Sequence, residues 1–444
     1  MASKKTMKTQ YQNSPIELWG GVECTVNRVR NQYFNQLERT GHWRRETDID
    51  RFAELGLQAL RFPLLWETLA PDSPASIDWS WADQRLTKLR DLGIRPIVGF
   101  LHHGSGPRYT DLIDPLFPKK FARFARQIAR RYPWIDAYAP INEPLTTARF
   151  SALYGHWYPH EQCDASFARA ILNESRATIL AMEEIRNVNP NALLVQTEDL
   201  GRTYSTRAMK YQADFDNERR WLTWDLLLGY VRPGSPMWDY FLWAGVTASD
   251  LAFFRKQHCR VDILGINHYV TSDRYLDENV HKYPHEVHGR NHRHVYADDA
   301  AVRARHIISA GFSTAIAEAH NRYALPMALT EVHLGSTVDE QMRWFHEAWQ
   351  SSQLMRERGM DVRAVTTWAL LGSFDWDSLV TRQAGNYEAG AFELRDDCLH
   401  PTALANMLKI LARDHCIKDP SLELPGWWRK RSRLRPFLLE ELAA

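Results

Sequence analysis

The amino-acid sequence predicts one large α/β domain, a (β/α)8 TIM barrel. Two observations support this fold class: short β-rich runs recur eight times along the 444 residues, and segments with helical periodicity separate them. Strands that alternate with helices are typical of parallel sheets, and eight such units can close into a barrel. The eight candidate strands are residues 16–23, 57–62, 94–101, 137–142, 192–197, 261–269, 325–331 and 364–370.

Predicted helices lie between many of these strands along the chain. Apolar residues at helical spacing predict helices at 48–55, 81–92, 121–131, 165–188 and 338–356. Two longer connections, 201–260 and 271–300, exceed what a barrel needs. We expect them to shape a substrate cleft, because the loops after the strands form the functional face of such barrels. A doubly wound sheet is the structural alternative, but no Gly-rich phosphate fingerprint follows the first strand.

No linker, low-complexity tract or short repeat divides the chain. We therefore expect an N-terminal extension at 1–15, a single barrel domain with inserted loops at 16–419, and a strongly basic C-terminal tail at 420–444. A docking or membrane-surface role is an alternative for the tail. A solvated, partly packed extension is the simpler expectation.

Composition limits the partners and the compartment. The 55 basic and 54 acidic residues give a net charge of +1, so nothing favours nucleic acid as a partner. Aromatic residues make up 12% of the chain, which suits a neutral partner such as a carbohydrate, although large barrels bury many aromatics. The five cysteines are scattered, and no apolar leader or membrane span is evident. These features predict a cytoplasmic protein.

Two carboxylates stand at the ends of candidate strands four and seven. Glu143 lies in Ala-Pro-Ile-Asn-Glu-Pro (139–144) and Glu331 in Ala-Leu-Thr-Glu-Val-His (328–333). Pro144 disfavours right-handed helical angles at Glu143, so we expect an extended strand end there. A lone carboxylate at a strand end is commonly a solvated cap. A facing pair, however, matches the two groups that glycosidic cleavage needs, which stand about 5 to 5.5 Å apart in the retaining version.

Seven motifs occur in a fixed order between residues 18 and 394. They are Leu-Trp-Gly (18–20), Leu-Arg-Phe-Pro (60–63), Leu-His-His-Gly (101–104), Ile-Asn-Glu-Pro (141–144), Leu-Gly-Ile-Asn-His-Tyr (264–269), Leu-Thr-Glu (329–331) and Trp-Ala-Leu-Leu-Gly-Ser-Phe-Asp-Trp (368–376). Together they resemble glycoside hydrolase family 1, the β-glucosidase-like group, over nearly the whole chain. The resemblance implies a TIM barrel and a retaining β-glycosidase that uses no cofactor and no metal.

The resemblance implies a role for each matching residue. Glu331 would be the nucleophile and Glu143 the general acid, then the general base. Arg61 would keep Glu331 ionised, and Tyr269 would donate a hydrogen bond to it. Asn142 would meet the sugar hydroxyl beside the reacting carbon. The substrate-binding residues would be Asn27, His103, Asn267, Trp368, Asp375 and Trp376.

Four positions depart from the family pattern. Asn27 stands where the family has a glutamine, Asp375 where it has a glutamate, and Gly104 where it has an aromatic residue. Val-His (332–333), instead of Asn-Gly, follows Glu331. We expect these changes to alter the polar reach or the volume of the pocket, which disfavours plain glucose as the glycone.

Five histidines lie in the second insertion: His281, His285, His288, His292 and His294. No acidic ligands at fixed spacing accompany them, so we expect a cleft-lining loop rather than a metal site. Three functions stay open at this point. They are a retaining β-glycosidase or transglycosidase, a carbohydrate-binding barrel without turnover, and a metal-dependent barrel hydrolase. The presence of both carboxylates favours the first.

Overall fold

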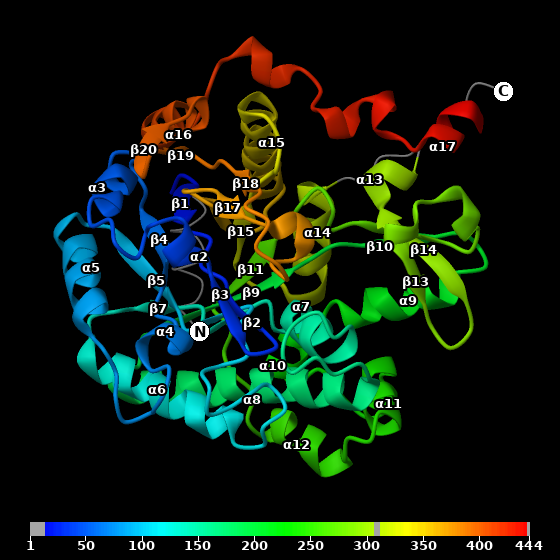
Figure 1. Cartoon of the computed structure of the whole chain (residues 1–444), viewed down its shortest axis with the longest axis horizontal. Coiled ribbons are helices and arrows are strands. Elements are labelled where there is room, and N and C mark those ends of the chain that lie inside the picture. The colour runs from blue at the N-terminus through cyan, green and yellow to red at the C-terminus, as the bar shows by residue number, and fades with distance from the viewer. Residues whose placement is uncertain (1–13, 306–310, 442–444) are drawn as a thin grey trace.

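Eight parallel strands close into a barrel in the computed structural model, which describes residues 14–305 and 311–441 (Figure 1). The eight predicted strands and the predicted fold class are confirmed. In order around the barrel, the strands are β1 (Glu17–Gly21), β4 (Ala59–Pro63), β5 (Arg95–Gly99), β7 (Ala137–Tyr138), β9 (Leu193–Asp199), β11 (Ile263–Asn267), β15 (Met327–Val332) and β16 (Val362–Thr367). Strand β1 closes the barrel by pairing with both β4 and β16.

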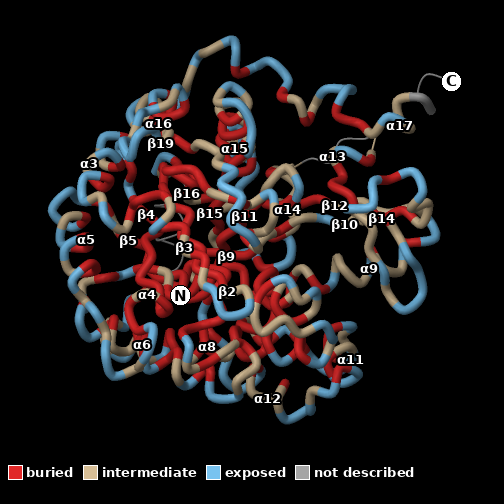
Figure 2. Tube along the Cα trace, viewed as in Figure 1, coloured by how far each residue is buried: buried red, intermediate tan, exposed pale blue. Residues whose placement is uncertain are grey.

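Small and β-branched side chains fill one layer of the barrel interior. They surround Trp19 and come from alternate strand positions: Ala59, Ile97, Ala137, Ala139, Val195, Ile263, Ala328 and Ala364. One indole occupies much of the volume, so five of these eight neighbours are alanines. Figure 2 shows the buried residues gathered in the barrel and on the inner faces of the surrounding helices.

The helices cover the barrel with their apolar faces. In α6, the side chains of Phe117, Phe121, Phe124 and Ile128 recur at helical spacing and are all buried. The principal outer helices are α3 (Asp48–Ala53), α5 (Ser80–Asp91), α6 (Phe117–Arg131), α8 (Asp164–Val188), α14 (Phe312–Tyr323), α15 (Val338–Glu357) and α16 (Ala403–Asp414). Every helix in the described part of the chain falls short of the length or the apolar character that crossing a membrane requires.

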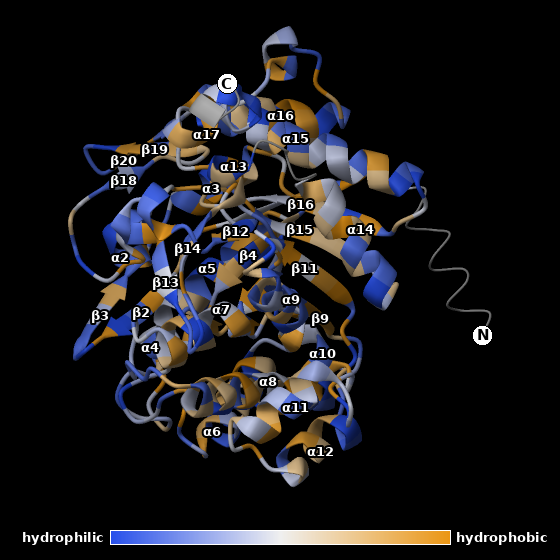
Figure 3. Ribbon diagram, turned by 90° about the vertical axis from the view of Figure 1, so that its right-hand side faces the viewer, coloured by the Kyte–Doolittle hydropathy of each residue, from blue (hydrophilic) through white to orange (hydrophobic). Residues whose placement is uncertain are grey.

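The two long insertions form a layer beside the barrel mouth. The first holds β10 (Thr203–Ser205) and the helices α9 (Lys210–Arg219), α10 (Leu222–Leu227), α11 (Pro236–Trp243) and α12 (Ala248–Lys256). The second supplies β12 (Arg274–Asp277), β13 (His288–Arg290) and β14 (Val295–Ala300), which join β10 in a four-stranded sheet of order β10-β12-β14-β13. In Figure 3 the inserted sheet and α9 face the viewer.

The C-terminal segment packs against the barrel more closely than a solvated tail would. It holds η5 (Pro420–Glu423), η6 (Trp427–Arg429), η7 (Arg431–Arg433) and α17 (Pro436–Glu441), and crosses from α16 to the inserted sheet (Figure 1). Trp428 is buried and donates to Glu347 over 2.9 Å, and Arg435 pairs with Asp299 at 2.7 Å. Some of its basic residues, such as Arg435, therefore take part in packing, whereas Lys430 and Arg431 are exposed. Residues 1–13, most of the expected N-terminal extension, lie outside the described residues.

Candidate active site

A cavity of about 740 Å³ lies at the carboxyl ends of the barrel strands. It brings together six residues that the sequence predicts for the site: His103, Glu143, Tyr269, Glu331, Trp368 and Trp376. Both predicted carboxylates therefore face one space, although 188 positions separate them in the chain. Residues of the second insertion, such as Thr271, Arg274 and Asp298, also line the cavity, as expected for a cleft-shaping loop, whereas the first insertion, which the structure describes in full, contributes no lining residue to it.

Glu331, near the end of β15, has a positively charged partner. The Arg61 guanidinium, from β4, donates to its Oε1 over 2.7 Å, and the Tyr269 hydroxyl donates to its Oε2. The Trp368 ring lies 4.4 Å from the guanidinium carbon of Arg61 and shields it. Burial raises the pKa of Glu331, and Arg61 and Tyr269 partly offset that rise.

Glu143 lies between β8 (Ile141–Asn142) and α7 (Pro144–Ala148). Its backbone is left-handed, with φ 43° and ψ 62°, so the expected extended strand end is wrong. The strand turns directly into α7 here, and the residue before a proline avoids the right-handed region, so the turn adopts left-handed angles. Asn267 donates to Glu143 Oε1 over 2.6 Å, and His103 Nε2 lies 3.8 Å from Oε2.

The two carboxyls differ in their electrostatic surroundings. Burial raises the pKa of Glu143 well above its usual range, and the charges of Glu331, Asp199 and Glu198 raise it further. Among the residues described, His103 is the one basic side chain within 4 Å of Glu143, and its ring is neutral because burial lowers its pKa. Within this part of the chain, Glu143 therefore has no cation beside it. When the pair loses one proton, Glu331 therefore loses it, because Arg61 stabilises its anion. Glu143 keeps a proton that it can donate.

Buried amides below the cavity hold this arrangement in place. Asn142 Oδ1 accepts from Arg61 and from Thr197 Oγ1, each over 2.7 Å. Asn267 Oδ1 accepts from Thr330 Oγ1 over 2.7 Å, which directs its amide nitrogen at Glu143. Asn267, predicted to bind substrate, thus contacts a carboxylate instead.

His103, Trp368 and Trp376 form an aromatic wall of the cavity. The rings of His103 and Trp376 meet edge to face with their centroids 5.5 Å apart. Burial, with the nearby charge of Arg61, lowers the pKa of His103 to about 3, so its ring is neutral. Contact of these three residues with a sugar stays a prediction.

Asn27 and Asp375 do not line the cavity. Asn27 is fully buried and donates to the carbonyl of Val380 over 3.0 Å. Asp375 pairs with Arg39 and accepts from the backbone N–H of Asn386 over 2.8 Å. Both side chains are held by loop backbone or by an ion pair, so the structure does not bring them to the position expected for sugar contacts.

Gly104 does not enlarge the cavity, contrary to the expectation from its missing side chain. A Cβ at this position would lie 2.0 Å from Oε1 of Glu67. The buried Glu67 side chain therefore fills the space that an aromatic residue would need. It binds the backbone N–H of Gly106 over 2.9 Å.

Sequence reasoning missed several residues that line the cavity: Glu23, Arg149, Asp199, Glu388 and Trp427. Glu23 is buried and accepts from the Trp368 indole nitrogen over 3.4 Å, and burial raises its pKa. It ends the first predicted strand run, and the same signal that identified Glu331 could have identified it. Trp427 belongs to the C-terminal segment, where no local pattern points to the cavity.

His333 explains one departure from the family pattern. Its Nε2 lies 3.2 Å from Oε1 of Glu388, and Ser373 donates to the same oxygen over 2.9 Å. All three residues line the cavity. The Val-His sequence after Glu331 thus places an imidazole–carboxylate pair on the wall.

The histidine-rich insertion lies near the cleft and makes ordinary polar contacts. His288 Nε2 lies 2.9 Å from the carbonyl of Val280, and His294 Nδ1 lies 3.0 Å from the Tyr211 hydroxyl. Residues 14–305 and 311–441 contain no group of three or more histidine, cysteine or acidic side chains placed to hold a metal.

A family model described as glycosyl hydrolase family 1 matches residues 24–387. A 6-phospho-β-glucosidase from Dickeya chrysanthemi is 23% identical over 251 residues, 52% of each chain. A β-glucosidase from Agrobacterium sp. (strain ATCC 21400) is 29% identical over 159 residues, 34% of each chain. The chain thus matches about half, or less, of the length of these curated relatives.

Solved structures of low sequence identity share the fold. A family 1 β-glucosidase from Thermotoga maritima superposes with a TM-score of 0.73 at 14% identity, covering 91% of this chain and 100% of that one. The same organism's β-glucosidase in complex with castanospermine gives a TM-score of 0.74 at 14% identity, covering 91% and 99%. Together with the family match over most of its length and the two carboxylates in one barrel cavity, this shows that the chain belongs to glycosyl hydrolase family 1.

Proposed function

We propose that this protein is a retaining β-glycosidase that cleaves O-glycosidic bonds by double displacement. The observation that carries this proposal is the difference between two buried carboxyls in one cavity. Glu331 has a guanidinium at 2.7 Å, whereas Glu143 has an amide and like charges as neighbours. One is poised as an anion and the other as an acid, which is the division of roles that the reaction needs.

In the first step, an Oε atom of Glu331 attacks the anomeric carbon. The glycosidic C–O bond breaks, and the leaving oxygen takes its electron pair and the proton of Glu143. In the second step, the Glu143 carboxylate removes a proton from water, and the water oxygen displaces Glu331 from the sugar. Asn267 holds Glu143 in position through both proton transfers. Asn142, oriented by Arg61, is proposed to bind the hydroxyl next to the anomeric carbon.

We propose a carbohydrate substrate whose glycone differs from plain glucose. The cavity lacks the side chains of Asn27 and Asp375, which would contact the outer hydroxyls in the family pattern. It has instead the carboxyl of Glu23 and the His333–Glu388 pair. A site built to hydrogen-bond particular hydroxyls discriminates strongly against sugars that leave those groups unpaired.

Azide rescue tests the two assigned roles separately. With an activated aryl β-glycoside, Glu331→Gly should lose turnover, and azide should restore it with an α-glycosyl azide as product. Glu143→Gly should yield the β-glycosyl azide, because azide then attacks the glycosyl-enzyme. The same product from both variants, or unchanged activity in Glu331→Gln, would contradict the assignment.

Two alternatives use the same cavity. A transglycosidase would pass the sugar from Glu331 to an acceptor sugar in place of water. A carbohydrate-binding barrel would bind glycosides without a burst of aglycone. A screen of activated glycosides that vary the sugar, with and without added acceptor sugars, separates these outcomes by product analysis.

A further inference from the structure

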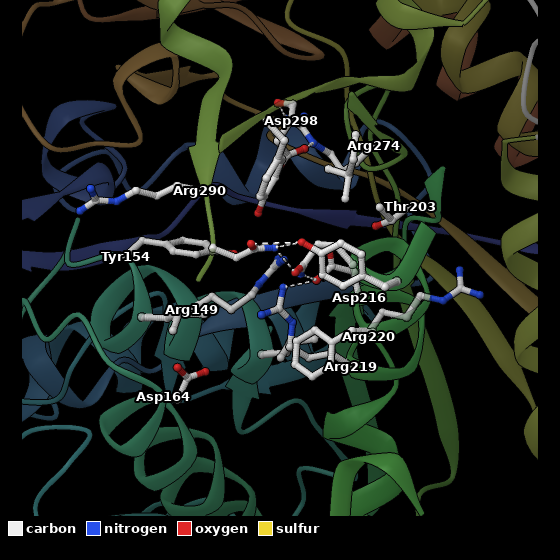
Figure 4. A pocket seen from close by; sticks show the side chains of 18 of the residues that line it. Arg149, Tyr154, Asp164, Thr203, Asp216, Arg219, Arg220, Arg274, Arg290 and Asp298 are labelled. Atoms are coloured by element: carbon white, nitrogen blue, oxygen red, sulfur yellow. Dashed lines mark hydrogen bonds and ion pairs between the residues drawn. The ribbon is translucent and has the colours of Figure 1, made fainter. Parts of the chain in front are cut away.

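A second chamber of about 750 Å³ adjoins the catalytic cavity. The two share six lining residues: Arg149, Tyr154, Asp199, Ser272, Arg274 and Asp298. The outer chamber lies between the segment after α7 and the two insertions (Figure 4). A leaving group that extends from the catalytic cavity would enter it.

Arginines dominate the charged lining of the outer chamber, with six of them against four aspartates. Three of the arginines have carboxylate partners. These pairs are Arg219–Asp216 at 2.7 Å, Arg220–Glu318 at 2.9 Å and Arg274–Asp298 at 2.8 Å. Their charges are largely neutralised within the protein.

The other three arginines, Arg149, Arg290 and Arg293, form no salt bridge within 4 Å in residues 14–305 and 311–441. Burial raises the pKa values of Glu198, Asp199 and Asp216, and the charge of Arg149, acting at longer range, offsets part of that rise. Arg149 is the most informative, because its Nε is buried without a hydrogen-bond partner. Its Nη2 makes only a long contact, 3.5 Å, with Thr146 Oγ1. Figure 4 shows its side chain reaching toward the middle of the chamber. A half-buried guanidinium with unused donors is costly unless a ligand completes it.

Two aspartates of the chamber also lack a cationic partner, and both have other contacts. Asp164 accepts from the Tyr240 hydroxyl over 2.6 Å, and Asp199 accepts from Ser272 Oγ over 2.5 Å. Burial raises the pKa of Asp199, and the hydrogen bond from Ser272 partly offsets that rise. Neither aspartate forms a salt bridge with Arg149, although the charge of Arg149 also partly offsets the rise in the pKa of Asp199.

The catalytic cavity has the opposite character. Four glutamates line it: Glu23, Glu143, Glu331 and Glu388. Arg149 lies on the boundary, because it lines both spaces. This polarity favours an uncharged sugar among the glutamates and a negatively charged group among the arginines.

We infer that the leaving-group side of the substrate carries an oxyanion, a carboxylate or a phosphate, which binds Arg149 in the outer chamber. This inference rests on the proposed glycosidase function. The planar guanidinium suits both oxyanions, because it can donate two parallel hydrogen bonds to either. Aromatic side chains of the chamber can cover a sugar or aryl ring beside the anion: Tyr154, Phe215, Tyr240 and Tyr296.

The test compares three phenyl β-glycosides that carry the same sugar, the best one found in the screen of activated glycosides, and that differ only at the para position. One carries a carboxylate, one a phosphate, and one the uncharged methyl carboxylate ester. Calorimetric titration uses the full chain with Glu331→Gln, so that nothing turns over. We expect one or both anions to bind about tenfold or more tightly than the ester, and the tighter of the two identifies the oxyanion. Added salt should weaken only the charged probes.

Arg149→Met should abolish the preference for the anions, whereas Arg413→Met should keep it. Arg413 is a matched control, because it is an exposed arginine on α16, far from the chamber lining. If Arg149→Met fails to fold, the double variant Arg290→Met/Arg293→Met, which changes two exposed side chains, should reduce the preference. Equal affinity for charged and neutral probes, or a preference that survives Arg149→Met, overturns the inference.

Binding and turnover report on separate claims. A charge preference in binding, with no aglycone released by the native enzyme from any glycoside, supports the subsite and contradicts the proposed hydrolysis. Turnover with no preference for charged leaving groups supports the proposed hydrolysis and contradicts the anion subsite. The free aglycones, 4-hydroxybenzoate and its methyl ester, repeat the comparison without any sugar and so do not depend on the choice of glycone.

Discussion

Replacing Tyr269 by phenylalanine removes one of the two groups that stabilise the Glu331 anion. The Tyr269 hydroxyl donates to Oε2, while Arg61 donates to Oε1 over 2.7 Å and is unaffected. A hydrogen bond to a charged group contributes about 1.5–3 kcal/mol. Because one pKa unit corresponds to about 1.4 kcal/mol, the pKa of Glu331 should rise by roughly one to two units.

The shift should appear in the pH dependence of turnover. The proposed attack needs ionised Glu331, so the acidic limb of kcat/KM should move upward by the same one to two units, roughly. The basic limb, which reports the proton on Glu143, should move less. The measurement is kcat/KM for an activated aryl β-glycoside across the pH range in which the protein stays folded, as monitored by Tm.

Tyr132→Phe is the matched control. Tyr132 also donates to a carboxylate, Asp83, over 2.7 Å, but neither residue lines the cavity. This variant should leave both limbs in place. An unshifted acidic limb in Tyr269→Phe, with the native Tm retained, would refute the assignment of Tyr269 as a donor that stabilises the reactive Glu331 anion.

Three further predictions concern other residues. Glu143→Gln should lower kcat/KM by about 10²–10⁴ for a glycoside with a poor leaving group and much less for a dinitrophenyl glycoside, because only the former needs a proton; equal losses would exclude Glu143 as the acid. Burial raises the pKa of Glu67 to about 8, from 4.5, so the folded state binds a proton that the unfolded state releases, and stability should fall as pH rises from about 4.5 to 8. Glu67→Gln removes this pH dependence. In denaturant unfolding at pH 8, the free energy of unfolding of the variant should exceed that of the native chain by at most roughly 5 kcal/mol, and near pH 4 the two should be similar. A difference that does not vary with pH would contradict the reasoning. Trp427→Ala removes an indole from the cavity wall, 4.2 Å from the Arg303 guanidinium carbon, and should raise KM with a smaller change in kcat; unchanged kinetics would show that the C-terminal segment only packs.

The local pattern of the chain predicts most of the fold. Runs of apolar residues form strands because their side chains must leave water, and the helical periods between them bury one face each. The same runs locate Glu143 and Glu331, since a residue at the carboxyl end of a barrel strand faces the cavity. Glu23 occupies an equivalent position and was missed because no second motif pointed to it.

Contacts between segments far apart in the sequence decide which side chains face the cavity, and short motifs do not reveal these contacts. Asn27 turns away from the cavity because its amide binds the carbonyl of Val380, which is 353 residues further along the chain. Glu67 closes the space beside Gly104, and Trp427 reaches the catalytic cavity from the far end of the chain. Each of these contacts depends on which segments the closed barrel brings together.

The sequence by itself determined the barrel, the family and the two carboxylates, because these depend on hydrophobic periodicity and on motifs a few residues long. Only the tertiary structure decided which polar groups stay free to meet a ligand. Arg149 forms no salt bridge among the described residues and its Nε has no hydrogen-bond partner, whereas Asp375 is already bound by Arg39. Whether a polar group is free depends on the position of every neighbour, and folding fixes those positions for all of them at once.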